Sequence, residues 1–115
     1  MNCDVALVDE ITVLSCRGRG DNDALPYFKE VAEELVDDVA VTRVVIDLGE
    51  VDYLCSAFLG VILLFHRQIK EKGGNLRVAR LTPFVKSLFE LTNLDSILAA
   101  QDTLEHAIRE LAEAP

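Results

Sequence analysis

The segment of residues 44–60 constrains the fold more than any other part of the chain. It begins with a continuous apolar run at 44–48 that only Asp47 interrupts. Such runs are usual in strands whose two sheet faces are both covered by helices. A short turn then leads to Ser56 and to an apolar stretch, for which we expect a helix over 56–72. A buried strand that leads directly into a long helix predicts an α/β fold.

The rest of the chain alternates between strand and helix patterns. Two runs rich in strand-favouring residues, at 5–8 and 11–16, are separated only by Asp9 and Glu10 and predict a hairpin. Further strands are expected at 44–48 and 76–80, with a short edge strand at 97–100, and helical spacing marks stretches beginning near 23, 56, 82 and 102. This order predicts a single domain, residues 1–115, with a mixed, mostly parallel sheet, an antiparallel first strand and about four helices.

The expected helix ends carry recognisable cap residues. Asp23 is expected to cap the first helix, with Pro26 in its first turn, and Thr82 to precede Pro83 at the start of the third. Asp102 and Glu105 resemble a capping box for the last helix. The glycine pair at 73–74 and Asn93 are expected to end the second and third helices.

The bulk composition excludes several classes of function. The net charge of −9 repels phosphate backbones, which argues against nucleic-acid binding. The same charge suits a partner with a basic patch, or it only keeps a small protein in solution. The apolar run at 57–65 is less than half of a membrane span. An odd cysteine count and no secretory segment predict a reducing compartment, so we expect a cytoplasmic protein without membrane insertion.

Ser56 is the residue whose position carries the most chemistry. At the start of a helix its hydroxyl lies near unpaired backbone N–H groups and the positive end of the helix dipole. A phosphate added there is tolerated locally and changes what the surface can bind. The alternative is a plain N-cap, in which the hydroxyl accepts from an N–H of the first turn and contributes about 1 kcal/mol. The two roles are compatible.

The remaining reactive residues do not form a catalytic set. His66 follows Ser56 along the same helix at a distance of about 15 Å, which is beyond the reach of a general base. His106 lies beside Glu105 on the last helix, and the three cysteines have no metal-ligand spacing. We therefore expect neither an enzyme, nor a metal, nor a cofactor. Cys55 is either a small buried hydrophobe or a thiol of lowered pKa at a helix N-terminus.

Acidic residues accompany the expected strand ends. Asp47 is expected to accept hydrogen bonds from the turn that follows its strand, which also supports the Ser56 loop. Asp21, Glu50 and Asp52 either form an acidic rim on one face, because loops at one end of a sheet converge, or are solvated turn residues.

Four motifs together resemble the STAS domain of the anti-sigma-factor-antagonist family, over nearly the whole chain. They are Asp47-Leu48 followed by Ser56-Ala57-Phe58-Leu59-Gly60, the turn Gly18-Arg19-Gly20-Asp21, the link Lys72-Gly73-Gly74-Asn75-Leu76, and the segment from Leu81-Thr82-Pro83 to Asn93-Leu94. Their order and spacing carry the resemblance. It implies a mixed sheet with helices and a regulatory switch.

The resemblance implies partner switching. In similar proteins a serine is phosphorylated by a partner kinase that is also the anti-sigma factor, the unphosphorylated antagonist binds that kinase and releases the sigma factor, and a serine phosphatase resets the system. By position, the phosphorylated residue is Ser56. The candidate partner contacts are Asp21, Tyr53, Cys55, Ala57 and Phe58.

Two departures from the family motif leave alternatives open. The aspartate that precedes the serine in the family is Cys55 here, and the first glycine of the motif is Phe58, which is either a partner contact or a core residue. They motivate a second hypothesis, a STAS interaction subunit of a signalling complex or a transport system that is not phosphorylated. Nucleotide binding is a third hypothesis, and it rests on analogy alone.

Overall fold

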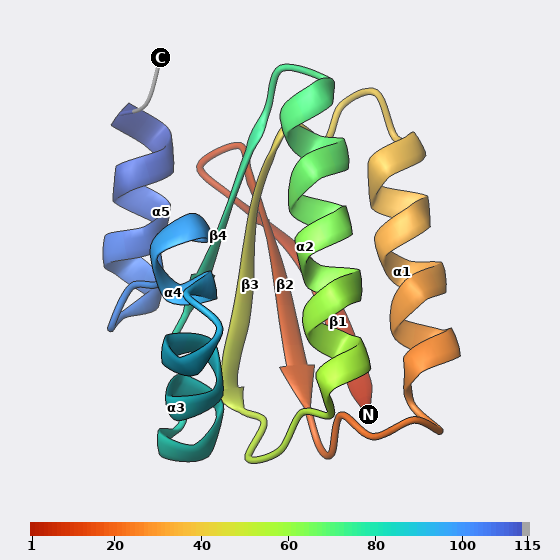
Figure 1. The fold of residues 1–115 in the computed structure, drawn as a ribbon. Coiled ribbons are helices and arrows are strands. Elements are labelled where there is room, and N and C mark those ends of the chain that lie inside the picture. The colour runs from red at the N-terminus through yellow and green to blue at the C-terminus, as the bar shows by residue number, and fades with distance from the viewer. Residues whose placement is uncertain (114–115) are drawn as a thin grey trace.

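The computed structural model describes residues 1–113 and is built on one four-stranded sheet in the order β1-β2-β3-β4 (Figure 1). β1 (Asn2–Val8) pairs antiparallel with β2 (Ile11–Arg17). β3 (Arg43–Glu50) runs parallel to β2, and β4 (Asn75–Ala79) runs parallel to β3. The predicted mixed, mostly parallel sheet with an antiparallel first strand is confirmed.

Helices cover both faces of this sheet. α1 (Leu25–Asp37), α2 (Ser56–Glu71), α3 (Pro83–Leu91) and α4 (Leu94–Ile97) bury their apolar sides in the larger core, on one face. α5 (Leu104–Glu113) packs on the opposite face, against β2, β3 and β4, where it closes a smaller core (Figure 1). The chain is therefore a three-layer α/β structure.

The apolar run in β3 is continuous because both of its faces are covered. Val44 and Ile46 point into the larger core, whereas Val45 between them points into the smaller one, and all three are fully buried. Alternation of side chains across a strand makes this pattern unavoidable for a central strand in three layers.

Several predicted helix ends are confirmed. Pro26 and Pro83 lie in the first turns of α1 and α3. Gly73, with φ +86°, follows α2 in the left-handed region that glycine adopts without strain, and Asn93 adopts a similar conformation, with φ 60°.

Two predicted caps are wrong. Ala24, not Asp23, occupies the N-cap position of α1, and the Ala24 N–H donates to Oδ1 of Asp21 at 3.1 Å. At α5 the capping side chain is Thr103 rather than Asp102, because its Oγ1 accepts from the His106 N–H at 3.1 Å. The helix α1 therefore starts without a side-chain cap, whereas at α5 the hydroxyl of Thr103 reaches an N–H of the first turn.

The short edge strand predicted at 97–100 is also wrong. Residues Leu94–Ile97 form the single turn of α4, an extra helix beyond the four expected. Leu94 and Leu98 are both buried, at a spacing of four residues that places them on the same side of a helix. The chain then meets β4 only through an isolated bridge between Ala79 and Gln101. Within residues 1–113, none of the helices combines the length and hydrophobicity that a membrane span requires.

Candidate functional site

The loops that follow β2 and β3 are joined directly beside the N-terminus of α2. The Gly20 N–H donates to the Tyr53 carbonyl at 2.9 Å, and the Cys55 N–H donates to the Gly20 carbonyl at 2.8 Å. Position 20 has to be glycine for this approach, because a Cβ there would lie 2.3 Å from Leu54 Cδ2 and 3.1 Å from the Tyr53 carbonyl oxygen. The pairing places Asp21 beside the Ser56 turn, as expected from the convergence of loops at one end of a sheet.

Ser56 is exposed and is the first residue of α2. Cys55 occupies the N-cap position, with φ −80° and ψ 162°, and its carbonyl accepts from the Phe58 N–H at 3.0 Å. The predicted N-cap role of the Ser56 hydroxyl is therefore wrong, since the helix begins one residue earlier than that role requires. Instead, the hydroxyl lies on the surface at the first turn of α2, where backbone N–H groups lack helical partners.

Cys55 lies between the core and the surface. It is half-buried and packs against the larger core, and its Sγ lies 3.5 Å from Oδ1 of Asn22, to which the thiol donates. This contact adds a side-chain link to the backbone hydrogen bonds that hold the two loops together.

Arg19, Tyr53 and Phe84 form a stack on the same end of the molecule. The Arg19 guanidinium lies 4.0 Å from the centre of the Tyr53 ring, and the Tyr53 and Phe84 rings stack with centroids 5.5 Å apart. Phe84 remains 50 % exposed. Arginine and aromatic side chains in such positions are common anchors of protein interfaces.

Sequence reasoning missed Arg19 and Phe84 as surface residues. The sequence did contain a signal for Phe84. Val85 and Phe89 lie four residues apart, which marks the apolar side of the helix, and the structure buries both fully. Phe84 is off that apolar side of the helix, next to the proline that starts it, so its ring has no place in the core. Arg19 carried no such signal, because its position depends on the pairing of two loops.

Phe58 belongs to the core and is not a surface contact. It is 1 % exposed, and its ring lies 5.2 Å from that of Phe28 on α1. Of the two interpretations left open for this residue, the structure supports the core interpretation, and the candidate contact at Phe58 is corrected accordingly. Ala57, one residue earlier, is exposed.

Asp47 and Thr82 make side-chain hydrogen bonds near the end of β3. The Asp47 carboxylate is buried and accepts from the Gly49 N–H at 3.0 Å. The acceptor role predicted for Asp47 is thus present, but its partner lies within β3 and not in the turn that follows the strand. Thr82 donates its hydroxyl to the Val51 carbonyl at 2.6 Å and does not cap α3 with its side chain. The end of β3 is thereby joined to the start of α3, the helix that carries Phe84.

The comparison with known families identifies the fold. The model of a STAS domain family, described as "Mlab, STAS domain", matches residues 3–100. The chain belongs to the STAS family. The resemblance carried by the four sequence motifs is confirmed.

Individual relatives of this STAS domain are named as regulators. BtrV of Bordetella bronchiseptica, named as an anti-sigma factor antagonist, is 39 % identical over 70 residues, which span 61 % of this chain and 60 % of that protein. A crystal structure of an anti-sigma factor antagonist from Thermotoga maritima superimposes with a TM-score of 0.87 and 25 % identity, covering 95 % of this chain and 93 % of that one. The phosphorylated form of the Bacillus cell fate determinant SpoIIAA shares the fold, with a TM-score of 0.74 and 18 % identity, over 95 % and 98 % of the two chains.

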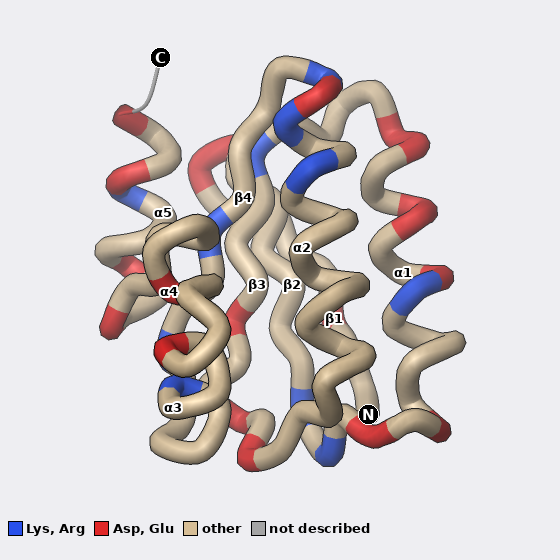
Figure 2. Tube along the Cα trace, in the orientation of Figure 1, with Lys and Arg blue, Asp and Glu red and all other residues tan. Residues whose placement is uncertain are grey.

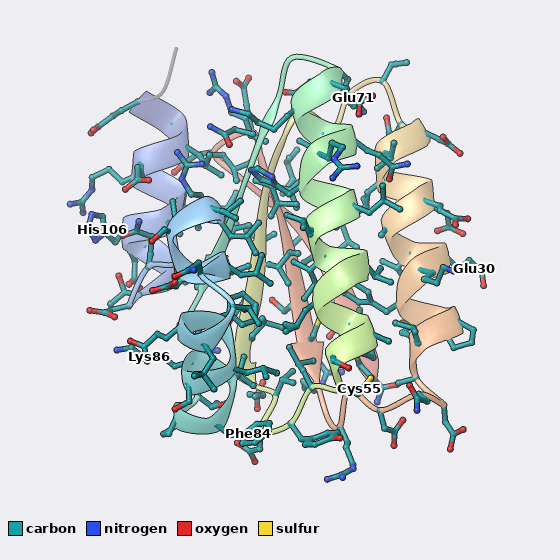
Figure 3. All side chains as sticks on the ribbon, viewed as in Figure 1. Glu30, Cys55, Glu71, Phe84, Lys86 and His106 are labelled. Carbon is teal, nitrogen blue, oxygen red and sulfur yellow. The ribbon has the colours of Figure 1, made fainter. Side chains whose placement is uncertain are left out.

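The STAS domain presents what we call the Ser56 surface, whose exposed or half-exposed residues are Arg19, Asp21, Tyr53, Cys55, Ser56, Ala57, Gly60 and Phe84. Figure 3 shows Cys55 and Phe84 at the same end of the molecule, while His106 lies on α5. The first half of α2 carries no charged residue (Figure 2). Acidic residues are distributed along α1, and basic residues lie near the C-terminal end of α2. The surface is thus largely apolar and aromatic, with acidic residues at its margin.

Titratable groups suited to catalysis do not converge on this surface. His66 is half-buried in the second half of α2, and burial, with Lys70 and Arg77 nearby, lowers its pKa from the ordinary value. Among residues 1–113, no group of histidine, cysteine, aspartate and glutamate side chains is arranged to hold a metal ion. What the site offers is a hydroxyl and a contact surface.

Proposed function

We propose that this STAS domain is an anti-sigma factor antagonist that binds an anti-sigma factor through the Ser56 surface. The names of its relatives support this role, and the aromatic stack of Arg19, Tyr53 and Phe84 supplies the contact area. We further propose that the same anti-sigma factor is a serine kinase that phosphorylates Ser56, and that a serine phosphatase reverses the modification. The domain itself acts by binding and not by catalysis.

The position of Ser56 carries this proposal. Its side chain is exposed at the first residue of α2, so a kinase can reach the hydroxyl without opening the core. A phosphate there would lie near the free N–H groups and the positive end of the helix dipole, so the fold tolerates it. It would also add a charge of about −1.5 to −2 beside Asp21, on a surface that the partner must otherwise approach closely.

Phosphorylation would weaken binding through two effects. A phosphate is strongly hydrated, so burying it against a partner is costly unless a cation of the partner pairs with it. It also repels acidic groups of the partner at short range. The structure of SpoIIAA in a phosphorylated form shows that the same fold accommodates a phosphate in that relative.

Affinity capture from the native cell, followed by intact-mass analysis, tests the proposal. We expect an anti-sigma factor with a kinase domain among the captured proteins, and one phosphate on Ser56 in a fraction of the recovered chain. With the captured partner, Ser56→Asp should bind at least about 10-fold more weakly than the wild type, while Ser56→Ala keeps its affinity but accepts no phosphate. Ser96 is an exposed serine on α4, so Ser96→Asp is the matched charge control and should bind the partner with wild-type affinity.

The same experiment separates a second candidate function. Cys55 stands where the family motif has an aspartate, so the group that flanks the serine has lost its charge. This observation favours a STAS interaction subunit that binds its partner constitutively. In that case Ser56 carries no phosphate in cells, even in the chain that is recovered together with its partner. Loss of binding in Phe84→Ala would then still locate the interface on the Ser56 surface.

A further inference from the structure

Cys3 and Cys16 form a pair of thiols across the β1–β2 hairpin. They are direct partners in the antiparallel register, and their Sγ atoms lie 3.2 Å apart, joined by an S–H···S hydrogen bond. Both cysteines are reduced in this structure. Cys16 is buried, whereas Cys3, on the edge strand, is half-exposed.

Directly opposite residues in an antiparallel sheet form either hydrogen-bonded or non-hydrogen-bonded pairs, and the Cα atoms are closer together in the second kind. The backbone hydrogen bonds of Cys3 show that Cys3 and Cys16 form a pair of the second kind. The Cys3 N–H donates to Tyr27 Oη at 3.2 Å, and the Tyr27 hydroxyl donates to the Cys3 carbonyl at 3.4 Å. Both backbone groups of Cys3 therefore point away from β2, so Cys3 and Cys16 occupy a non-hydrogen-bonded site. At such sites the Cα atoms are about 4.5 Å apart, within the range that a disulfide spans.

We propose that Cys3 and Cys16 form a reversible disulfide when a hydroperoxide oxidises the folded protein. Cys3 is the attacking residue, because it is accessible from the edge of the sheet, and Cys16 is the resolving residue. The third cysteine, Cys55, lies on a different loop with its thiol on Asn22, outside this pair. The inference is independent of the Ser56 surface and of its partner.

The electronic environment agrees with these roles. The hydrogen bond from the Cys16 thiol stabilises a thiolate at Cys3, and with the positive N-terminus and Arg17 it lowers the pKa of Cys3 despite partial burial. The hydrogen bond with Cys3, together with burial, raises the pKa of Cys16. The thiolate, which is the form that attacks peroxides, therefore forms on the exposed member of the pair.

The reaction balances with one hydroperoxide. The Cys3 thiolate attacks the O–O bond, so that an S–O bond forms at Cys3 and hydroxide or alkoxide leaves. The Cys16 sulfur then attacks the Cys3 sulfenic acid, the S–S bond forms, and the S–O bond breaks to release water with the proton of Cys16. Two sulfur atoms are oxidised and the two oxygen atoms of the peroxide are reduced. A small dithiol reverses the reaction by exchange.

Peptide mapping of the folded full-length chain, after treatment with hydrogen peroxide, tests this assignment. Cleavage after Glu10 leaves Cys3 and Cys16 on separate peptides, so only the disulfide can join them. We expect the joined pair, with the loss of two hydrogen atoms, and its disappearance after dithiothreitol. The bridge should also raise the midpoint of thermal unfolding by roughly 10 °C.

Matched variants make the result decisive. Cys55→Ser should form the bridge as the wild type does. Cys3→Ser should form none, and its two remaining cysteines should be oxidised to sulfenic acid no faster than an ordinary exposed thiol is. Peroxide treatment that leaves Cys3 and Cys16 reduced, or that joins either of them to Cys55 instead, would overturn the proposal. So would a bridge that forms only after unfolding in urea.

Discussion

Arg80 donates two parallel hydrogen bonds to Asp47, from Nε to Oδ1 at 2.9 Å and from Nη2 to Oδ2 at 3.0 Å. The carboxylate side chain is 6 % exposed, whereas the guanidinium side chain is 44 % exposed. The pair thus joins a buried acid in the second half of β3 to a solvated base directly after β4. Together with the Gly49 N–H, it satisfies the only acidic side chain that is buried among residues 1–113.

Removing Arg80 should therefore cost stability. Arg80→Leu leaves the Asp47 carboxylate buried with one remaining hydrogen bond to the Gly49 N–H, and we expect a loss of about 2 kcal/mol in the free energy of unfolding. Urea denaturation measures it. Arg67→Leu, at an exposed position on α2, is the matched control and should change stability little. Equal midpoints for the two variants would show that the Asp47–Arg80 pair contributes nothing.

Two glycines should respond in opposite directions to alanine. A Cβ at Gly60, on the exposed side of α2, meets nothing within 4 Å, so Gly60→Ala should stabilise the protein by about 0.5–1 kcal/mol through helix propensity. A Cβ at Gly74 would lie 1.9 Å from the Thr42 carbonyl oxygen, so Gly74→Ala must displace backbone and should destabilise by about 2 kcal/mol. Thermal unfolding compares the two, and a shift of the same sign for both would contradict the close contact at Gly74.

Alanine substitutions at Phe58 and Phe84 should affect different properties, the first mainly stability and the second mainly partner binding. Phe58→Ala opens a cavity beside Phe28 and should cost about 3–5 kcal/mol of stability. Phe84→Ala removes a half-exposed ring that stacks on Tyr53, and should cost less than about 1 kcal/mol while weakening partner binding. Calorimetry and a binding titration on the same samples measure both quantities. Full partner affinity in folded Phe84→Ala would exclude the aromatic stack from the interface.

His66 should make the protein less stable in mild acid. Burial, helped by Lys70 and Arg77, lowers the pKa of His66 in the folded state, while in the unfolded chain it stays near its ordinary value of about 6.5. The unfolded chain then binds more protons between these two values. The corresponding stability is present above about pH 6.5 and is lost as the pH falls toward the folded-state value.

Urea midpoints at a series of pH values between neutrality and mild acid measure this effect. His66→Gln should flatten the decline of stability with falling pH, whereas His106→Gln, at an exposed position on α5, should leave the decline in place. A decline that is unchanged in His66→Gln would assign it to carboxylates instead.

Much of the fold follows from local sequence patterns. The strand at 44–48, the helix that begins at Ser56 and the glycine and asparagine helix ends were all predictable, because burial on two faces, helical spacing and left-handed turns leave direct marks on residue type. The edge strand predicted at 97–100 failed because the spacing of Leu94 and Leu98 fits a turn of helix, which a four-residue apolar run cannot distinguish from a strand.

The sequence by itself determined the layered α/β architecture and the position of the surface serine at the start of α2. Only the tertiary structure decided which residues surround that serine. Arg19 and Tyr53 come from two separate loops and Phe84 from the first turn of α3, and Cys3 meets Cys16 through strand register. Contacts of this kind depend on the angles and distances between packed elements, and these leave no periodic pattern along the chain from which they could be read.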